Sequence, residues 1–208
     1  MLRPFWLLTA WWIIDMRVIA GTAKGRRLKP VPGHVTRPIT DRAKEALFNI
    51  LGDFVVEARV LDLFAGTGAV GIEALSRGAA EVVFIDRSSA ALRTVRENLQ
   101  HTRLTERAIA LRADALKYLL GPIEAPFDLI YIAPPQYRGL WADALRALDR
   151  CPGWLSTYPE GESGIVVTQI HPREYQDLAL ENLTEYDRRK YGSTLLCFYE
   201  LVESHSAE

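Results

Sequence analysis

Residues 60–71 read Val-Leu-Asp-Leu-Phe-Ala-Gly-Thr-Gly-Ala-Val-Gly, and this stretch indicates the fold class of the chain. Its first part, Val60–Phe64, is an apolar run typical of a buried strand. Its second part places Gly66, Gly68 and Gly71 in the pattern G-x-G-x-x-G, and a helical pattern follows. Glycines between a strand and a helix let the chain turn tightly and let a ligand lie against the backbone. The stretch therefore predicts a nucleotide-binding loop, of a kind that NAD enzymes also have.

From Arg59 onward the sequence alternates between strand-like and helix-like segments, which predicts a mostly parallel, doubly wound α/β sheet. Two runs joined at residues 191–193 predict a closing antiparallel hairpin, and residues 17–28 predict a small basic hairpin at the start. The predicted strands are Val60–Phe64, Val82–Ile85, Ala108–Leu111, Phe127–Ile132, Gly164–Val167, Thr184–Lys190 and Thr194–Leu201. The predicted helices run from the N-cap Thr40 through Asp53, from Ala69 to Arg77, from the N-cap Ser88 through Gln100, and over Ala115–Leu119, Leu140–Leu148 and Pro172–Leu183.

Three carboxylates follow or end predicted strands, where ligands bind in such sheets. Asp62 stands where a dinucleotide enzyme normally has an apolar residue, and it can face a cationic group such as the methionyl end of S-adenosylmethionine. Asp86 comes 20 residues after Gly66, the place of an acid that binds ribose hydroxyls; the alternative is a strand-end cap. Asp114 can accept from an adenine amine while the backbone of Ala115 donates. Its alternative, helix N-capping, is compatible with that role.

The fourth predicted strand is followed by Ala133-Pro134-Pro135-Gln136-Tyr137. Prolines fix the backbone and remove N–H donors, which leaves carbonyls that can accept from an amine. The alternative is a rigid turn. Because the segment comes at the same sheet edge as the glycine loop, where ligands bind, we favour a ligand-facing role over the rigid turn.

Composition places the chain among ordinary globular proteins, with 208 residues, 49% hydrophobic and 25% charged. General disorder is excluded, and two cysteines exclude a disulfide framework and a four-cysteine zinc site. The net charge of −1 is a cancellation, because residues 16–44 carry +7 and residues 45–208 carry −8. A basic arm on an acidic body is one layout for binding an anionic polymer, and a solvated loop is the alternative.

Residues 1–15 contain an uncharged, largely apolar run of ten residues, Phe5–Ile14. A membrane-spanning helix needs about 20, and no signal-peptide cleavage pattern follows. Met16 immediately precedes the basic arm. We interpret residues 1–15 as a non-native or mis-assigned extension, with an interfacial anchor as the alternative.

Four segments together resemble the RsmD family of 16S rRNA guanine-N2 methyltransferases. They are the basic hairpin at residues 17–28, the stretch Arg37–Leu51 (RPITDRAKEALFNIL), the glycine loop at residues 62–71 and the run Arg188–Gly192 (RRKYG). The second segment is long and specific, and the resemblance spans residues 17 to about 203. It implies a seven-stranded methyltransferase fold that uses S-adenosylmethionine and methylates the exocyclic N2 amine of a guanine in 16S rRNA.

The resemblance also implies roles for individual residues and a division of the chain. Cofactor-binding residues are Asp62, Phe64, Gly66, Thr67, Gly68, Gly71, Asp86, Arg87, Asp114 and Ala115. RNA-binding residues are Arg17, Lys24, Arg26, Arg27, Lys29, Arg37 and Arg42, the last two with a possible role in ordering the cofactor pocket. The division is an extension at 1–15, a basic hairpin and helix at 16–53 and a methyltransferase domain at 54–208.

The resemblance implies that residues 133–137 form the catalytic segment, and two positions in it depart from the family pattern (D/N)-P-P-(Y/F). Ala133 replaces the carboxylate or amide that accepts from the target amine. In register, Gln136 takes the place of the aromatic residue that stacks on the flipped base, with Tyr137 one step later. The Pro134 carbonyl could accept alone, Gln136 could supply an oxygen and Tyr137 could stack after a local shift. The outcome is weakened activity, an altered substrate, or a cofactor- or RNA-binding protein without catalysis.

An NAD-dependent oxidoreductase is a further, weaker alternative. The four scattered histidines predict no metal site. We expect a cytoplasmic protein, monomeric and off the membrane, whose partner is 16S rRNA or a small-subunit assembly particle.

Overall fold

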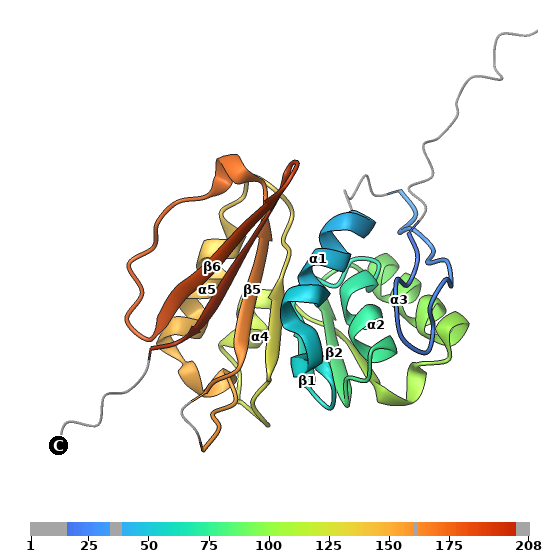
Figure 1. The fold of residues 1–208 in the computed structure, drawn as a ribbon, viewed down its shortest axis with the longest axis horizontal. Coiled ribbons are helices and arrows are strands. Elements are labelled where there is room, and N and C mark those ends of the chain that lie inside the picture. Colours follow the sequence, from blue (N-terminus) through green and yellow to red (C-terminus); the bar gives the residue numbers. More distant parts are fainter. Residues whose placement is uncertain (1–15, 34–38, 160–161, 203–208) are drawn as a thin grey trace, which may run out of the picture.

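A computed structural model describes residues 16–33, 39–159 and 162–202. Its centre is a seven-stranded sheet in the order β3-β2-β1-β4-β5-β7-β6 (Figure 1). Strands β1 to β5 are parallel, and β7 runs antiparallel to both β5 and β6. The strands are β1 (Arg59–Asp62), β2 (Glu81–Asp86), β3 (Ala108–Arg112), β4 (Leu129–Ile132), β5 (Ile165–Ile170), β6 (Leu183–Tyr191) and β7 (Thr194–Leu201). The predicted doubly wound α/β fold with a closing hairpin is confirmed.

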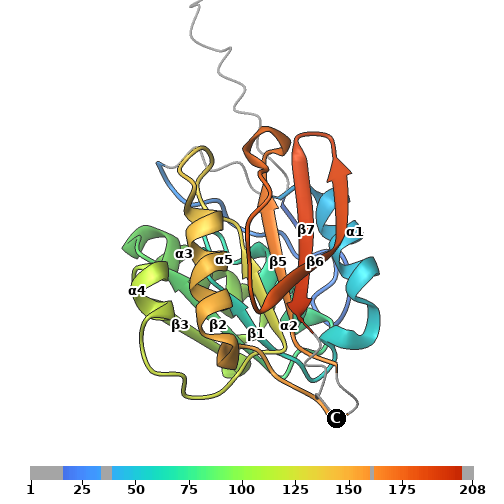
Figure 2. The same ribbon diagram turned by 90° about the vertical axis from the view of Figure 1, so that its left-hand side faces the viewer.

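Five α-helices cover the two faces of the sheet, with α1 and α5 on opposite sides (Figure 2). Apolar side chains of α1, α2 and α3 form one core cluster with the first face. Those of α4 and α5 form a second cluster with the other face. The helices are α1 (Asp41–Leu51), α2 (Ala69–Ser76), α3 (Ser89–Thr102), α4 (Ala115–Leu119) and α5 (Leu140–Arg150). Short 3-10 turns cover Gly52–Val55, Thr105–Arg107, Pro152–Trp154 and Pro172–Glu174.

Side-chain caps begin the helices α1, α3 and α4 at the positions that the sequence predicts. Thr40 accepts from the backbone N–H of Ala43 at the start of α1, and Ser88 caps α3 in the same way. Each cap satisfies a backbone donor that has no partner within the helix. α1 ends at Leu51, two residues before the predicted end, because Gly52 follows with a φ of 52°.

The basic hairpin is present and packs against α2. Arg17 and Arg27 form an antiparallel bridge, and the Val18 N–H donates to the Arg26 carbonyl at 2.9 Å. Apolar residues of this segment and of α1 share a core cluster with the sheet. The division of the chain at residues 53/54 stays a prediction, and residues 1–15 lie outside the described residues.

The predicted helix Pro172–Leu183 is wrong. Only the 3-10 turn at Pro172–Glu174 forms, and the chain then runs without regular structure to β6. Asp149 on α5 accepts from the backbone N–H groups of Glu181, Asn182 and Leu183 at 2.8–3.1 Å. These contacts outweigh the helical periodicity, because they satisfy backbone donors through a long-range side chain.

Strand β5 is also longer than expected. The sequence predicts its end at Val167, whereas the structure continues it through Ile170. This extension places Gln169 near the carboxyl end of the strand, beside the glycine loop's edge of the sheet. Among the described residues, no helix is long and apolar enough to span a bilayer.

Candidate active site

A pocket of about 370 Å³ opens at the carboxyl ends of β1, β2 and β4. Its size suits a small-molecule ligand, and its position is the usual binding edge of an open α/β sheet. Of the predicted site residues, the wall includes Asp62, Phe64, Gly66, Thr67, Asp86, Arg87, Asp114, Ala115, Ala133, Pro134, Pro135 and Gln136. The structure thus brings together segments that lie far apart in the sequence.

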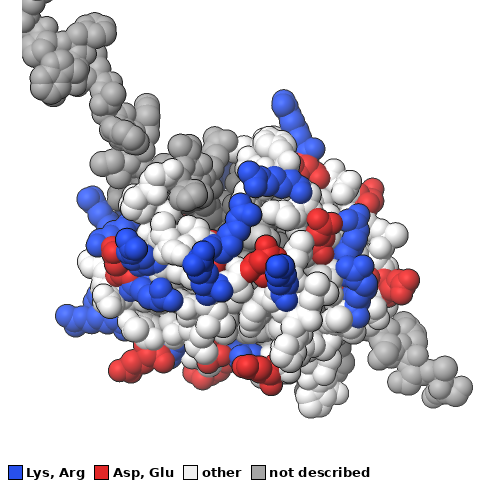
Figure 3. Space-filling view, turned by 180° about the vertical axis from the view of Figure 1, so that it is seen from behind, with Lys and Arg blue, Asp and Glu red and all other residues white. Residues whose placement is uncertain are grey.

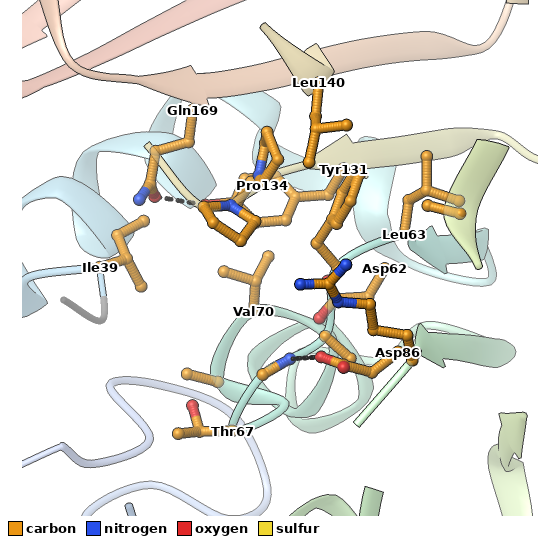
Figure 4. A pocket seen from close by; sticks show the side chains of 18 of the residues that line it. Ile39, Asp62, Leu63, Thr67, Val70, Asp86, Tyr131, Pro134, Leu140 and Gln169 are labelled. Atoms are coloured by element: carbon orange, nitrogen blue, oxygen red, sulfur yellow. Dashed lines mark hydrogen bonds between the residues drawn. The ribbon is translucent and has the colours of Figure 1, made fainter. Parts of the chain in front are cut away.

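Asp86 holds the glycine loop in place at one end of the pocket (Figure 4). Its Oδ2 accepts from the Gly66 N–H at 3.0 Å, and its Oδ1 accepts from the Ser88 N–H at 2.8 Å. Gly66 has a φ of 54°, a conformation that a side chain would strain. The strand-end contact that we weighed as an alternative is present, and each carboxylate oxygen keeps a lone pair for a further donor. The role of Asp86 at a ribose stays a prediction.

Asp62 is a buried carboxylate in the pocket wall, with 2% of its surface exposed. Its Oδ2 accepts from the Gly71 N–H at 3.3 Å. Burial raises the pKa of Asp62 to about 7, the backbone contact with Gly71 opposes this rise, and the charge of Asp86 adds to it. The hydrogen bond from Gly71 offsets only part of the cost of burying this charge. A cationic ligand group would therefore be a favourable partner for Asp62.

Two of the predicted cofactor-binding glycines are not in the pocket wall. Gly68 caps α2 in a left-handed conformation. Gly71 packs against β2, because a Cβ there would lie 2.3 Å from Cε1 of Phe84. Gly71 therefore permits close helix–strand contact, and its N–H reaches Asp62.

Asp114 caps α4, and its carboxylate accepts from the Lys117 N–H at 3.1 Å. This confirms the capping role. Because Asp114 and Ala115 both line the pocket, the adenine-binding role remains compatible with the capping role and stays a prediction.

The catalytic segment after β4 divides into two parts. Ala133, Pro134, Pro135 and Gln136 line the pocket. Tyr137 is 65% exposed and outside the wall, and it has a φ of 59°. Its N–H donates to the Glu174 carboxylate at 2.6 Å, and its ring lies against His171. The ring of Tyr137 therefore lies outside the pocket, and its stacking role stays a prediction.

The structure adds pocket residues that the sequence analysis did not identify, among them Ile39, Tyr131, Leu140 and Gln169. Figure 4 shows Ile39, Pro134 and Gln169 at the end of the pocket opposite Asp86 and Thr67. The Tyr131 hydroxyl donates to Oε1 of Gln169. Gln169 could have been identified as a polar residue near the end of the apolar strand Ile165–Ile170. It was missed because the predicted strand ended at Val167, which left Gln169 outside it.

The predicted RNA-binding residues lie on the surface, and several contact the protein itself. Arg17 pairs with Asp41 at 3.1 Å and Lys29 with Glu97 at 2.8 Å. Arg26 donates to the His101 carbonyl at 2.5 Å. Lys24, Arg27 and Arg42 are exposed, and Arg37 lies outside the described residues. Figure 3 shows that Lys and Arg side chains also spread over the face opposite Figure 1, with acidic residues among them.

His171 and two tryptophans have structural roles. His171 accepts from the Arg173 N–H as the N-cap of the 3-10 turn at Pro172–Glu174. Trp141 and Trp154 are buried in the core. Within the described ranges, no group of three or more His, Cys, Asp or Glu side chains could hold a metal ion.

Comparisons with known proteins agree with this geometry. A family model described as conserved hypothetical protein 95 matches residues 16–200. The YlbH protein of Bacillus subtilis is 39% identical over 188 residues, which is 89% of this chain and 98% of that protein. Ribosomal RNA small subunit methyltransferase D of Escherichia coli is 38% identical over 143 residues, which is 68% of this chain and 70% of that enzyme.

A solved structure of the yhhF protein of Escherichia coli has the same architecture, with a TM-score of 0.76 and 31% sequence identity. The match covers 90% of this chain and 98% of that one. These findings confirm the family that the sequence motifs indicated. The chain belongs to the conserved hypothetical protein 95 family, the family of the RsmD proteins.

Proposed function

We propose that this protein methylates the N2 amine of a guanine in 16S rRNA and uses S-adenosylmethionine as the methyl donor. The observation that carries the proposal is the pocket that joins Asp62, Asp86 and the glycine loop to Pro134 and Pro135. Relatives named as ribosomal RNA small subunit methyltransferase D support the rRNA substrate. The substrate is the free 16S rRNA or a small-subunit assembly particle, met by a monomer in the cytoplasm.

The residues present fit the donor. The buried Asp62 suits the cationic methionyl amine, and the partly satisfied Asp86 can accept from ribose hydroxyls. Asp114 and Ala115 offer an acceptor and a backbone donor to an adenine. When bound, S-adenosylmethionine supplies an electrophilic methyl group on a sulfonium. Phe64, Thr67 and Arg87 also line the pocket that would hold this donor.

The protein's own contribution is to position the guanine. The Pro134 carbonyl accepts from the target amine, which directs the nitrogen lone pair toward the methyl group. Pro135 holds that carbonyl in place, because a proline ring restricts the backbone. No strong base is required, since the amine proton leaves to water after the N–C bond forms.

A methyl-transfer assay tests this function. Small ribosomal subunits from cells that lack this protein are incubated with it and labelled S-adenosylmethionine, and the labelled nucleotide is mapped. We expect one labelled N2-methylguanine in 16S rRNA. Binding of S-adenosylhomocysteine without RNA labelling would contradict the proposal and favour a binding protein that lost catalysis through Ala133. Binding of NAD in place of S-adenosylhomocysteine would favour an oxidoreductase.

A further inference from the structure

The small side chain of Ala133 leaves room beside it for a polar group from the neighbouring strand. Ile132 of β4 pairs with Thr168 of β5 in parallel register, so Ala133 and Gln169 come next on the two strands. Side chains alternate between sheet faces. Ala133 therefore shares its face with Tyr131, and Gln169 shares it with Val167. The cluster that contains Tyr131 and Val167 also contacts Ala133, which confirms that these side chains meet on one face.

Tyr131 fixes the amide of Gln169. The Tyr131 side chain is buried, with 2% of the residue exposed, and its hydroxyl donates to Oε1 of Gln169. Burial, and secondarily the charge of Asp62, raises the pKa of Tyr131 well above its usual value. The hydroxyl therefore keeps its proton at neutral pH and remains a donor. This contact orients the amide at the pocket end that Figure 4 shows.

The amide retains unused hydrogen-bonding capacity. A carboxamide oxygen has two lone pairs, and the nitrogen carries two donors. Among the described residues, Tyr131 is the one partner to which the Gln169 side chain is hydrogen-bonded. Gln169 is only half-buried and lines the pocket with Ala133 and Pro134, so one acceptor site and the N–H₂ group can meet a ligand.

We propose that Gln169, held by Tyr131, reads the guanine edge that carries the target amine and supplies the side-chain acceptor that Ala133 lacks. This inference rests on the proposed function. Oε1 accepts from the N2 amine, and Nε2 donates to the adjacent ring nitrogen N3. The pair of contacts matches the donor and acceptor of that edge, which a carboxylate at the same place would satisfy only in part. Gln169 is thus a substrate-contacting residue, and Tyr131 is a positioning residue.

The primary test compares four variants for methyl transfer to small subunits at saturating S-adenosylmethionine. Gln169→Met preserves side-chain length without hydrogen bonds, and we expect kcat/KM to fall about 10- to 100-fold. Tyr131→Phe should give a smaller loss. The control Gln100→Met lies near the far end of α3, about 16 Å along the helix from its first residue, Ser89, and should retain wild-type activity. Gln136→Met tests the other glutamine of the pocket wall.

Two further variants separate a substrate contact from a structural role. Gln169→Glu keeps the acceptor but replaces the donor, except when the carboxyl is protonated. Its kcat/KM relative to wild type should therefore rise as pH falls. Ala133→Asn added to Gln169→Met should recover at least part of the lost activity, because the new amide lies on the neighbouring strand of the same face.

Binding of S-adenosylhomocysteine, measured by calorimetry, should be unchanged in every variant and shows that each one folds. Unchanged kcat/KM in Gln169→Met, or a large loss in Gln136→Met without one in Gln169→Met, would overturn the role of Gln169. So would a Gln169→Glu activity ratio that does not vary with pH. Absence of methyl transfer by the wild-type protein would instead overturn the proposed function.

Discussion

At the scale of single residues, the buried carboxylate of Asp62 in the pocket wall couples stability to pH. Burial of Asp62 in the pocket wall lowers the stability of the folded protein when its carboxylate is ionised, because a charged group is disfavoured away from water. A raised folded-state pKa means that the folded protein binds more protons than the unfolded chain. Stability from this group is therefore complete below its ordinary pKa of 3.8 and is lost as pH rises toward 7.

Asp62→Asn should separate stability from function. The amide can still accept from the Gly71 N–H, and it carries no charge to bury. At pH 8 the variant should unfold at a higher temperature than wild type, with a gain of at most about 4 kcal/mol. At pH 5 the difference should be smaller, and affinity for S-adenosylhomocysteine should fall. Scanning calorimetry at both pH values checks this, with the exposed Asp143→Asn as control. An equal gain at both pH values would contradict it.

At the scale of elements, Glu73 on α2 attaches the amino-terminal hairpin and α1 to the sheet. Its buried carboxylate accepts from the N–H groups of Ile19 and Ala20 at 2.7 and 2.9 Å. It also lies 3.3 Å from Nζ of Lys44 and 2.9 Å from Nε of Arg77. Burial lowers the pKa of Lys44, and the charge of Glu73 opposes that effect. Lys44 thus counts toward the charge of the basic arm but acts inside the protein.

Glu73→Ala should destabilise the protein by about 3–5 kcal/mol, because it leaves the Lys44 cation buried without its partner. Denaturant unfolding measures this change. The combination of Glu73→Leu with Lys44→Met should recover part of the loss, since the buried Lys44 cation is then no longer left without its carboxylate partner. Asp143→Ala, which breaks the exposed pair with Arg146, should cost about 0.5 kcal/mol or less. A similar small cost for Glu73→Ala would show that the ion pair does not hold the hairpin.

At the scale of the whole molecule, charge is distributed in a way that the sequence total conceals. The exposed cations Lys24 and Arg42 belong to the hairpin and α1, on the face opposite α5. Arg146 and Arg150 lie on α5. Figure 3 shows that basic side chains are not confined to the amino-terminal arm. RNA binding through the arm therefore requires a test against another basic region.

Charge reversal at Lys24 and Arg42 should weaken rRNA binding and leave S-adenosylhomocysteine binding intact. Each lost phosphate contact should reduce the salt dependence, the slope of log K against log[salt], by about 0.7–0.9. Filter binding at several salt concentrations measures this slope. The matched reversal at Arg146 and Arg150 changes net charge equally and should have little effect. Equal losses in the two double variants would argue against a specific role for the arm.

Much of the fold and part of the site follow from local patterns. The strand β7 (Thr194–Leu201), the caps Thr40, Ser88 and Asp114, and the glycine loop at 62–71 are all where the sequence predicts them. Such features depend on neighbouring residues, through side-chain alternation, helical spacing and hydrogen bonds over a few positions. The order of the elements along the chain and the sheet edge that carries the pocket follow for the same reason.

Contacts between distant segments required the folded structure. Asp149 draws Glu181–Leu183 out of a helical pattern, and the register of β4 with β5 places Gln169 beside Ala133. A single sequence carries no local trace of these pairings, because they depend on which strands become neighbours and how far each extends. The sequence therefore specified the architecture and most residues of the candidate donor site, whereas three-dimensional packing determined which side chains surround the proposed substrate amine.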